Sequence, residues 1–169
     1  INPVVGQKKA NDFSPKAIFE SYEQMLRNNY YEPYPALIAS FNTYSRYSGP
    51  REAVFTALCR KNFGCSHFVV GRDHTGVGDY YPPDASQRIF EKLGDIGIEP
   101  IFFDEAYFCK VCNQVTTGCN HSQDERLKIS GSEVRKCLLD NSNVPDYLLR
   151  KDISELLNNI PKDQLFEQG

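Results

Sequence analysis

Several features that would place the chain in a common class are missing from its sequence. No apolar run approaches the ~20 residues that a transmembrane helix needs, so we expect no membrane span. The 19 Lys and Arg residues are balanced by 22 Asp and Glu, a formal net charge of -3, and the basic excess typical of nucleic-acid-binding proteins is lacking. No signal peptide is recognisable, which favours a cytoplasmic protein.

The composition is that of a globular domain. The chain has 169 residues, of which 40% are hydrophobic and 24% are charged, and this excludes a largely disordered protein. A chain of this length can bury roughly two-thirds of the surface that it exposes when unfolded. It begins with Ile1 rather than Met, and residues 1–5 read like the end of a strand. We therefore expect a fragment that starts inside a fold.

Helical and strand patterns alternate along the sequence. Ser14 and Pro15 favour the start of a helix, and Asp84 with Gln87 predicts a capping box. Helices are expected from residue 15 to 28, from 50 to 64, after 84, after 132 and over 152–157, and strands over 36–39, 66–70 and 98–103. Such alternation indicates an α/β fold with a mostly parallel sheet.

A glycine-rich polar stretch, GRDHTG at residues 71–76, follows the expected strand 66–70. In open α/β sheets, ligands bind beyond the carboxyl ends of the strands. The glycines allow backbone N–H groups to meet an anion, Arg72 offers forked donors for phosphate or sulfate, and His74 adds a donor or a switchable charge. The pattern is neither a Walker loop nor a dinucleotide fingerprint. An ordinary loop with a surface Arg–Asp pair is the alternative.

A second anion site is predicted where the helix after residue 132 begins. Ser130 and Ser132 precede this helix, whose unpaired N–H groups and positive dipole end favour phosphate. Arg135 follows one turn later and could reach the same group. The alternative is that one of the serines is only an N-cap.

Three of the six cysteines crowd together with a histidine. Cys109, Cys112, Cys119 and His121 supply four ligands of the kind that bind tetrahedral Zn²⁺. A closed set of four protein ligands leaves no open position, so a structural rather than catalytic zinc is expected. A redox Cys-x-x-Cys pair is the alternative, but it leaves Cys119 and His121 unexplained. The other cysteines are expected to be small core residues in a reducing cytoplasm.

Two longer motifs resemble the ATP-sulfurylase (sulfate adenylyltransferase) family. They are SRYSGPREA at residues 45–53 and RKNFGCSHFVVGRDH at residues 60–74. The likeness continues from NPVVG at 2–6 to ISGS at 129–132, and the cysteine-rich insertion is similar to that of bacterial and archaeal members with a structural zinc. The resemblance implies a Rossmann-like nucleotidyltransferase parallel sheet that lacks its first strand. It divides the chain into a partial α/β core (1–108), a small zinc-knuckle insertion (109–126) and a C-terminal helical segment (127–169).

That family converts ATP and sulfate to adenosine 5′-phosphosulfate and pyrophosphate. The resemblance implies that Arg72 and His74 are catalytic residues and that Mg²⁺ accompanies the ATP. The residues expected to bind ATP are Gly71, Arg72, Asp73, His74, Ala106, Ser130 and Arg135.

The family's sulfate contact matches the backbone of Thr75. Thr75 stands where the family usually has Ala, and we expect its branched side chain to narrow the sulfate pocket. Phe103 matches a residue linked to the response to ATP binding. Tyr44 and Ser45 also depart from the family's usual Ala-Met, which predicts altered local packing.

The family's Gln-Thr-Arg-Asn-Pro segment and paired histidines precede the position of Ile1 and are not in this sequence. We therefore expect the ATP-binding part of a sulfate adenylyltransferase, inactive alone, whose full-length protein forms a homo-oligomer. The missing strand leaves a sheet edge or face uncovered, which predicts association of the fragment. A non-catalytic, zinc-bearing nucleotide-binding or interaction module is the alternative.

Overall fold

The computed structural model describes residues 1–6, 8–76 and 78–168, which divide into two units. Residues 1–45 and 129–169 form the first unit, and residues 46–128 form the second. Each unit has its own cluster of buried apolar side chains.

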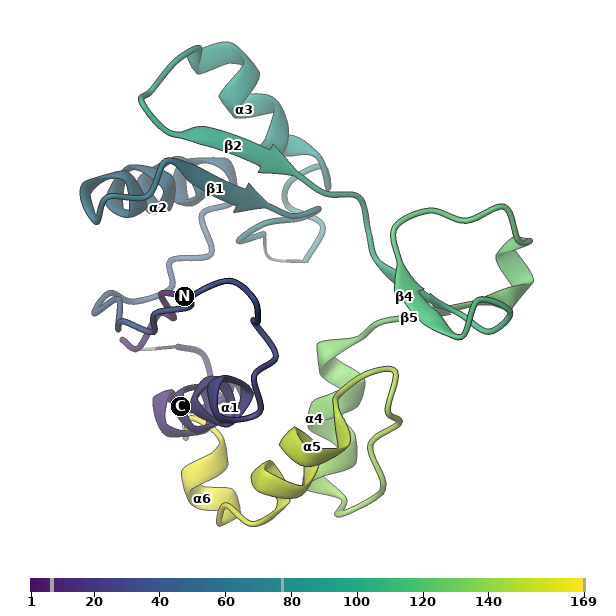
Figure 1. Ribbon diagram of the computed structural model, residues 1–169. Coiled ribbons are helices and arrows are strands. Elements are labelled where there is room, and N and C mark those ends of the chain that lie inside the picture. The colour runs from purple at the N-terminus through teal and green to yellow at the C-terminus, as the bar shows by residue number, and fades with distance from the viewer. Residues whose placement is uncertain (7, 77, 169) are drawn as a thin grey trace. The chain divides into compact units, whose positions relative to one another are not determined.

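Two parallel strands and two helices form the centre of the second unit (Figure 1). Helix α2 (Pro50–Asn62) is followed by strand β1 (His67–Val70), and helix α3 (Ala85–Leu93) is followed by strand β2 (Glu99–Phe102). The two strands pair in parallel, from His67 opposite Glu99 to Val70 opposite Phe102. This mixed α/β arrangement with a small parallel sheet confirms the expected fold class in its coarse form.

Small residues on α2 allow the helix to lie close to β1. Ala53 and Ala57 are fully buried together with Val70, and Phe90 of α3 and Ile98 complete this core. Because side chains of both helices meet Val70 in one cluster, the carboxyl end of β1 is firmly placed.

A separate antiparallel sheet follows β2. Its strands are β3 (Tyr107–Cys109), β4 (Gln114–Thr116) and β5 (Arg126–Lys128), in the order β4-β3-β5, with the short 3-10 helix η1 (Gln123–Glu125) before β5. Residues 107–128 are called the cysteine knuckle below. The sequence predicted the insertion but not its strands, because three-residue strands are too short to show an alternating pattern.

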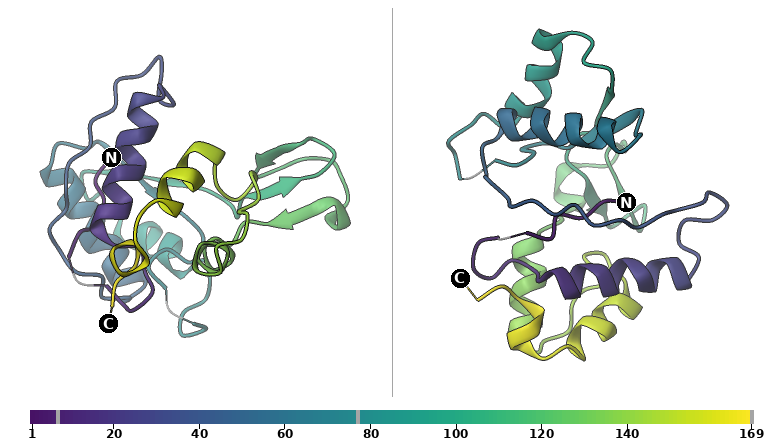
Figure 2. Two further views of the ribbon diagram at one scale, coloured as in Figure 1. Left: turned by 90° about the horizontal axis from the view of Figure 1, so that it is seen from below. Right: turned by 90° about the vertical axis from the view of Figure 1, so that its left-hand side faces the viewer.

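Helices dominate the first unit (Figure 2). They are α1 (Pro15–Arg27), α4 (Gly131–Leu139), α5 (Lys151–Asn158) and α6 (Lys162–Leu165). α1 packs against α5 and α6, and the core between them includes the fully buried side chains of Leu138, Val144 and Leu165. The short helix α6 was not expected from the sequence.

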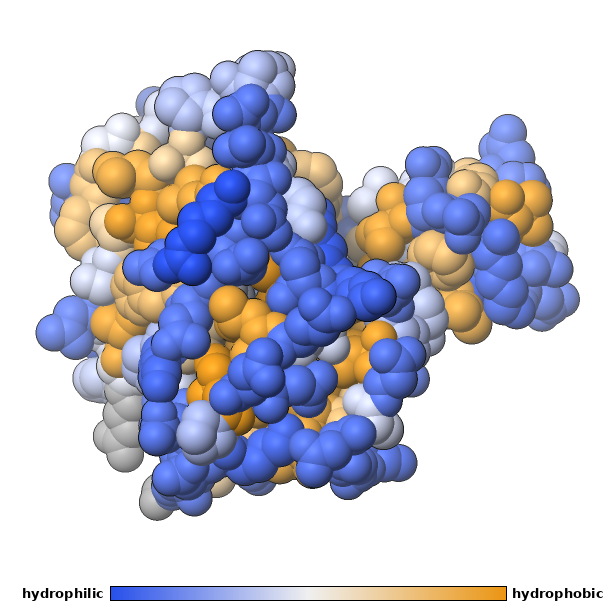
Figure 3. Space-filling view, turned by 60° about the horizontal axis from the view of Figure 1, so that its bottom comes forward, coloured by the Kyte–Doolittle hydropathy of each residue, from blue (hydrophilic) through white to orange (hydrophobic). Residues whose placement is uncertain are grey.

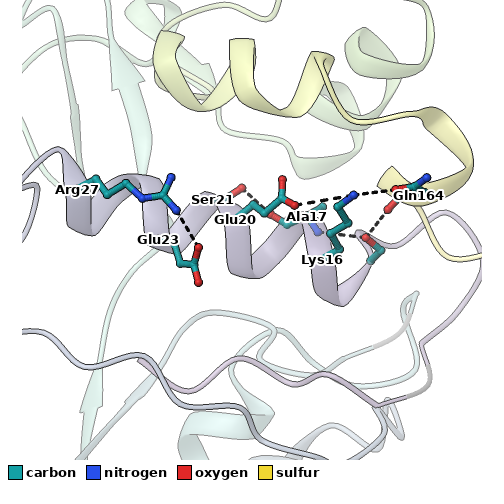
Figure 4. A network of polar contacts seen from close by, with 8 residues as sticks. Lys16, Ala17, Glu20, Ser21, Glu23, Arg27 and Gln164 are labelled. Carbon is teal, nitrogen blue, oxygen red and sulfur yellow. Dashed lines mark hydrogen bonds and ion pairs between the residues drawn. The ribbon is translucent and has the colours of Figure 1, made fainter.

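The start of α1 is tied to the end of the chain (Figure 4). The Ser14 hydroxyl oxygen accepts the Ala17 N–H at 3.1 Å, which confirms the predicted N-cap, and the hydroxyl donates to the Gln164 carbonyl at 2.6 Å. Along the exposed side, Lys16 pairs with Glu20 and Arg27 pairs with Glu23. Exposed pairs four residues apart contribute only a few tenths of a kcal/mol each, so packing and the cap decide where this helix lies.

Two local predictions are wrong. Residues 36–39 form no strand: the Ala39 N–H donates to the Ile1 carbonyl at 2.9 Å, but the β-bridge next to this segment joins Val4 and Phe41, outside 36–39. A single short neighbour is too little for a regular ladder. The capping box at Asp84 is also absent, because the Asp84 carboxylate pairs with Arg88 at 3.1 Å.

No helix in the described part of the chain is long and apolar enough to cross a bilayer. Apolar side chains nevertheless reach the surface between charged ones, as the face in Figure 3 shows. Leu37, Val69 and Val111 are each more than half exposed.

Candidate functional site

The segment 71–76, called the β1 loop below, lies directly after the carboxyl end of β1. The Gln87 side chain of α3 donates to the carbonyls of Val70 and Phe103, each at 3.2 Å, and so links the ends of the two parallel strands. The β1 loop therefore begins at the position where parallel α/β sheets bind their ligands.

The backbone of the β1 loop is tightly turned. Asp73 and Thr75 both have positive φ, of 54° and 56°, and the Gly76 N–H donates to the Asp73 carbonyl at 3.1 Å. A Cβ atom at Gly76 would lie 2.0 Å from a carboxylate oxygen of Asp73, so a larger residue there would require the Asp73 side chain to move. Positive φ at a β-branched residue such as Thr75 is rare, and strained residues of this kind gather at functional sites.

Arg72 is exposed and has an acidic partner. Its guanidinium lies 3.2 Å from the Glu105 carboxylate, and Lys128 lies 3.8 Å from the same carboxylate. Glu105 precedes Ala106, so the ion pair brings the segment expected to hold adenine to the β1 loop. Sequence reasoning missed Glu105; its position next to Ala106 is the signal that could have found it.

His74 turns towards the interior of the unit. Its ring meets the Phe68 ring edge-on, with centroids 5.5 Å apart, and its buried Nε2 has no hydrogen-bond partner among the described residues. Burial lowers the pKa of His74 below its usual value; the Glu52 carboxylate opposes this shift and the Arg60 guanidinium adds to it. The imidazole is thus held neutral near pH 7, with one ring nitrogen available for a new partner.

The second predicted anion site belongs to the first unit. The Ser130 hydroxyl oxygen accepts the Glu133 N–H at 3.3 Å, so the N-cap alternative is confirmed for this residue. Arg135 donates to the Ser132 hydroxyl at 3.1 Å and pairs with the Asp12 carboxylate at 3.5 Å. That Ser130 and Arg135 bind ATP stays a prediction.

The four predicted metal ligands come together in the cysteine knuckle. Their ligand atoms, from Cys109, Cys112, Cys119 and His121, all lie within 4.8 Å of one another. The Nδ1 of His121 is 3.5 Å from Cys109 Sγ and 3.2 Å from Cys112 Sγ. Tetrahedral Zn²⁺ needs about 3.8 Å between two sulfurs and about 3.6 Å between sulfur and nitrogen, so this donor set fits that cation.

Two further side chains hold the ligands in place. The Tyr107 hydroxyl donates to Cys119 Sγ at 3.3 Å, and Arg126 donates to the His121 carbonyl at 3.1 Å while its guanidinium stacks 4.5 Å from the Tyr107 ring. The hydrogen bond from Tyr107 lowers the pKa of Cys119 to about 6, whereas hydrogen bonding with Cys109 raises the pKa of Cys112 to about 11. A bound cation would deprotonate both thiols.

A separate apolar groove of about 530 Å³ lies in the first unit, between α1, α5 and residues 3–4. None of the predicted site residues lines it. Its lining is mostly apolar, with Lys8 and Arg150 as the cationic residues, and does not match a binding site for a polyphosphate, which needs several converging cationic or N–H donors.

Comparison with known proteins agrees with the motifs. The family model described as ATP-sulfurylase matches residues 1–160. The chain is 40% identical over 164 residues to a protein of Thermococcus onnurineus named sulfate adenylyltransferase, covering 96% of this chain and 43% of that protein. A protein of the same name from Halothermothrix orenii is 41% identical over 161 residues, covering 93% of this chain and 42% of that protein. The chain thus spans about two fifths of the length of these relatives.

Proposed function

The chain belongs to the ATP-sulfurylase family, and we propose that it forms the ATP-binding part of the catalytic domain of a sulfate adenylyltransferase. The reaction joins ATP and sulfate to give adenosine 5′-phosphosulfate and pyrophosphate. One observation carries the proposal: the β1 loop follows the carboxyl end of a parallel strand, turned at Asp73 and Thr75, with Arg72 exposed beside Glu105. We also propose that the small parallel sheet belongs to a Rossmann-like nucleotidyltransferase fold.

The reaction requires orientation rather than a general base. Sulfate is already ionised at pH 7, so its oxygen can attack the α-phosphorus of ATP without losing a proton. The difficulty is to align two anions that repel each other and to stabilise the charge on the phosphorus centre and the departing pyrophosphate. Fixed N–H groups and a guanidinium meet that demand.

The β1 loop supplies such groups. We propose that Arg72 and His74 act in catalysis, that Gly71, Asp73 and Ala106 help to hold ATP, and that the backbone of Thr75 meets sulfate. For Arg72 to bind a phosphate, its guanidinium must share or leave the Glu105 carboxylate. The neutral imidazole of His74 would then act as a hydrogen-bonding group and not as a cation.

Within the first unit, we propose that Ser130 and Arg135 at the start of α4 contribute to ATP binding. The Ser130 hydroxyl is used as the N-cap, so phosphate would be met by remaining N–H groups of the first turn and by Arg135. Arg135 already pairs with Asp12, and binding of a phosphate would compete with that pair.

The metal centre has a structural role in this proposal. Cys109, Cys112, Cys119 and His121 would hold Zn²⁺ with a complete set of protein ligands, which leaves no coordination position for a substrate. Mg²⁺ would arrive with ATP, bound mainly by phosphates and water. We further propose that the full-length protein works in the cytoplasm as a homo-oligomer.

The test is made on the complete protein that carries this chain. Pyrophosphate release is measured with ATP and sulfate, for the unchanged protein and for Arg72→Ala. Loss of the guanidinium should lower kcat/KM by at least about a hundredfold, as for other donors to a developing charge. Arg88→Ala removes an exposed arginine of α3 and should leave the rate within about twofold. An Arg72→Ala protein with unchanged activity would contradict the site assignment.

A second candidate function is that of a non-catalytic, zinc-bearing nucleotide-binding or interaction module. The four-ligand cluster of the cysteine knuckle favours it, because such a cluster is needed for structure and not for turnover. Calorimetry with ATP distinguishes the two. A module would bind ATP but release no pyrophosphate, even in the complete protein with sulfate present.

A further inference from the structure

The β1 loop is joined to the turn that precedes α2, far away in the sequence. The Gly49 N–H donates to the Thr75 carbonyl at 3.0 Å. The Thr75 hydroxyl lies 2.9 Å from the Gly49 carbonyl and 2.7 Å from the His74 carbonyl, and its single proton is shared between these two acceptors. The backbone bond and the hydroxyl contact both link Thr75 to Gly49, 26 positions away in the chain. This pair of contacts fixes the distance between the β1 loop and the start of α2.

Gly49 can take this position only as glycine. Its φ is 53°, and a Cβ atom there would lie 2.5 Å from the Tyr81 ring. The turn before it is equally unusual, because Tyr47 also has positive φ, of 51°. A turn with two such residues does not hold its shape by backbone preference alone.

The Glu52 side chain stabilises this turn by accepting hydrogen bonds from its backbone. Its side chain is buried, with 6% of the residue exposed, and one carboxylate oxygen accepts the Arg46 N–H at 2.8 Å while the other accepts the Ser48 N–H at 3.0 Å. A buried carboxylate is tolerated only when its oxygens find donors, and charged acceptors make the stronger hydrogen bonds. Glu52 therefore holds residues 46–48 in the conformation that presents Gly49 to Thr75.

The other side of the β1 loop is held by neutral groups. The Ser86 hydroxyl donates to the His74 carbonyl at 2.7 Å, and the Asp73 N–H donates to the Pro83 carbonyl at 2.6 Å. Glu52 is thus a buried charge whose hydrogen bonds act on the backbone next to the β1 loop.

We propose that Glu52 is a positioning residue for the β1 loop, acting through the Gly49–Thr75 pair and not through contact with a substrate. The inference rests on the proposed function, in which the loop's donors must already point at the reacting groups. Small displacements of such groups lower the rate strongly, because their value lies in preorganisation. Thr75 contributes to this arrangement through its hydroxyl as well as its backbone.

The test compares Glu52→Gln with Glu91→Gln in the complete protein. An amide has one acceptor oxygen, so one of the two N–H groups loses its partner, and kcat for pyrophosphate release should fall about tenfold. KM for ATP should change less than threefold, because ATP still meets the same donors. Glu91 lies exposed on α3, and its variant should keep the unchanged protein's kcat.

A double-mutant cycle separates positioning from general destabilisation. Thr75→Val removes the hydroxyl but keeps the shape, and Thr75→Ser keeps the hydroxyl and should recover most of the lost kcat. Glu52 and Thr75 are proposed to stabilise the same loop conformation. The fold-decrease in kcat of the double variant Glu52→Gln with Thr75→Val should therefore be much smaller than the product of the fold-decreases of the two single variants. Losses that multiply would overturn the proposal.

Hydrogen exchange at the Gly49 amide gives a readout that needs no activity. Exchange there should quicken about tenfold in both Glu52→Gln and Thr75→Val, while amides of α4 keep their rates. Unchanged exchange at Gly49 would overturn the proposal even if activity fell. A protein that makes no phosphosulfate but shows faster Gly49 exchange would instead count against the proposed function alone. If Glu52→Gln fails to fold, Glu52→Asp replaces it in the same two measurements, because its shorter carboxylate cannot reach both the Arg46 and the Ser48 N–H groups.

Discussion

The α/β part of the second unit and its cysteine knuckle are stable for different reasons. In the α/β part, five buried apolar residues of α2, β1, α3 and the segment before β2 form one core. In the knuckle, residues 107–128 are all described and only Cys109 is buried. Three strands of three residues each cannot bury enough surface to stay folded alone. Apolar packing holds the first region, and the zinc proposed at the four ligands would hold the second.

The two regions also carry different parts of the candidate function. The region with the apolar core carries the β1 loop, where backbone groups must be held still. The knuckle carries the ligand set that fits a zinc ion but leaves no open position. Changes in one region should therefore leave the other measurably intact.

Loss of a metal ligand should have the largest of the predicted effects, and it should destabilise the cysteine knuckle while the α/β part stays folded. Cys112→Ser removes one of four ligands, and bound zinc should fall from about one ion per chain towards none, because the folding of such small sites is coupled to metal binding. Metal analysis measures the ion, and hydrogen exchange should show that residues 107–128 open while α2 keeps its protection. Cys59→Ser, a cysteine of α2 outside the cluster, serves as the control and should keep its zinc. Equal zinc content in both variants would contradict the four-ligand site.

A core substitution should produce the reverse pattern. Phe90 has 5% of its surface exposed, and Phe90→Ala should lower the free energy of unfolding of the α/β part by about 3–5 kcal/mol. Leu93→Ala on the same helix removes a half-exposed side chain and should cost about 1 kcal/mol or less. Denaturant unfolding measures both, and zinc content should stay constant. If Phe90→Ala released the zinc, the two regions would not be independent.

The smallest predicted effect is a pH dependence at His74. The pKa of His74 in the folded state lies below 6.5, its usual value and the one expected in the unfolded state. At a pH between the folded-state pKa and 6.5, the unfolded state therefore binds more protons than the folded state. Stability should therefore fall as the pH is lowered through this window, by at most about 1.4 kcal/mol per pH unit. The charged groups that face the ring are Glu52 and Arg60. His74→Gln should flatten this part of the curve of unfolding free energy against pH. A slope that persists in the variant would assign the effect to another group.

Local signals in the sequence predicted much of the fold. The expected starts of α1 and α2 at Pro15 and Pro50 are confirmed, since proline and a capping residue act on the next few residues alone. The metal ligands were found because their spacing is short and their chemistry is specific. The strand at 36–39 was wrong because strand formation depends on a partner elsewhere in the chain.

The candidate site was predicted only in part for a similar reason. The glycines and Arg72 identify the β1 loop as a candidate anion-binding site from the sequence alone. No local motif points to Glu105 or Glu52, because an isolated glutamate is usually a solvated surface residue. Gln87 was expected to cap α3 but donates to two strand-end carbonyls, where unpaired acceptors were available.

By itself the sequence determined the α/β class, the ligand set of the knuckle and the position of the β1 loop, because each depends on residues close together in the chain. The tertiary structure alone decided that Gly49 and Thr75 bond to each other, that Glu52 is buried beneath their turn and that the His74 ring faces Phe68. Gly49 and Thr75 lie 26 positions apart, so only the folded backbone brings them together. The other two contacts are short in sequence, but they depend on the turns before α2 and after β1, which no local pattern predicts.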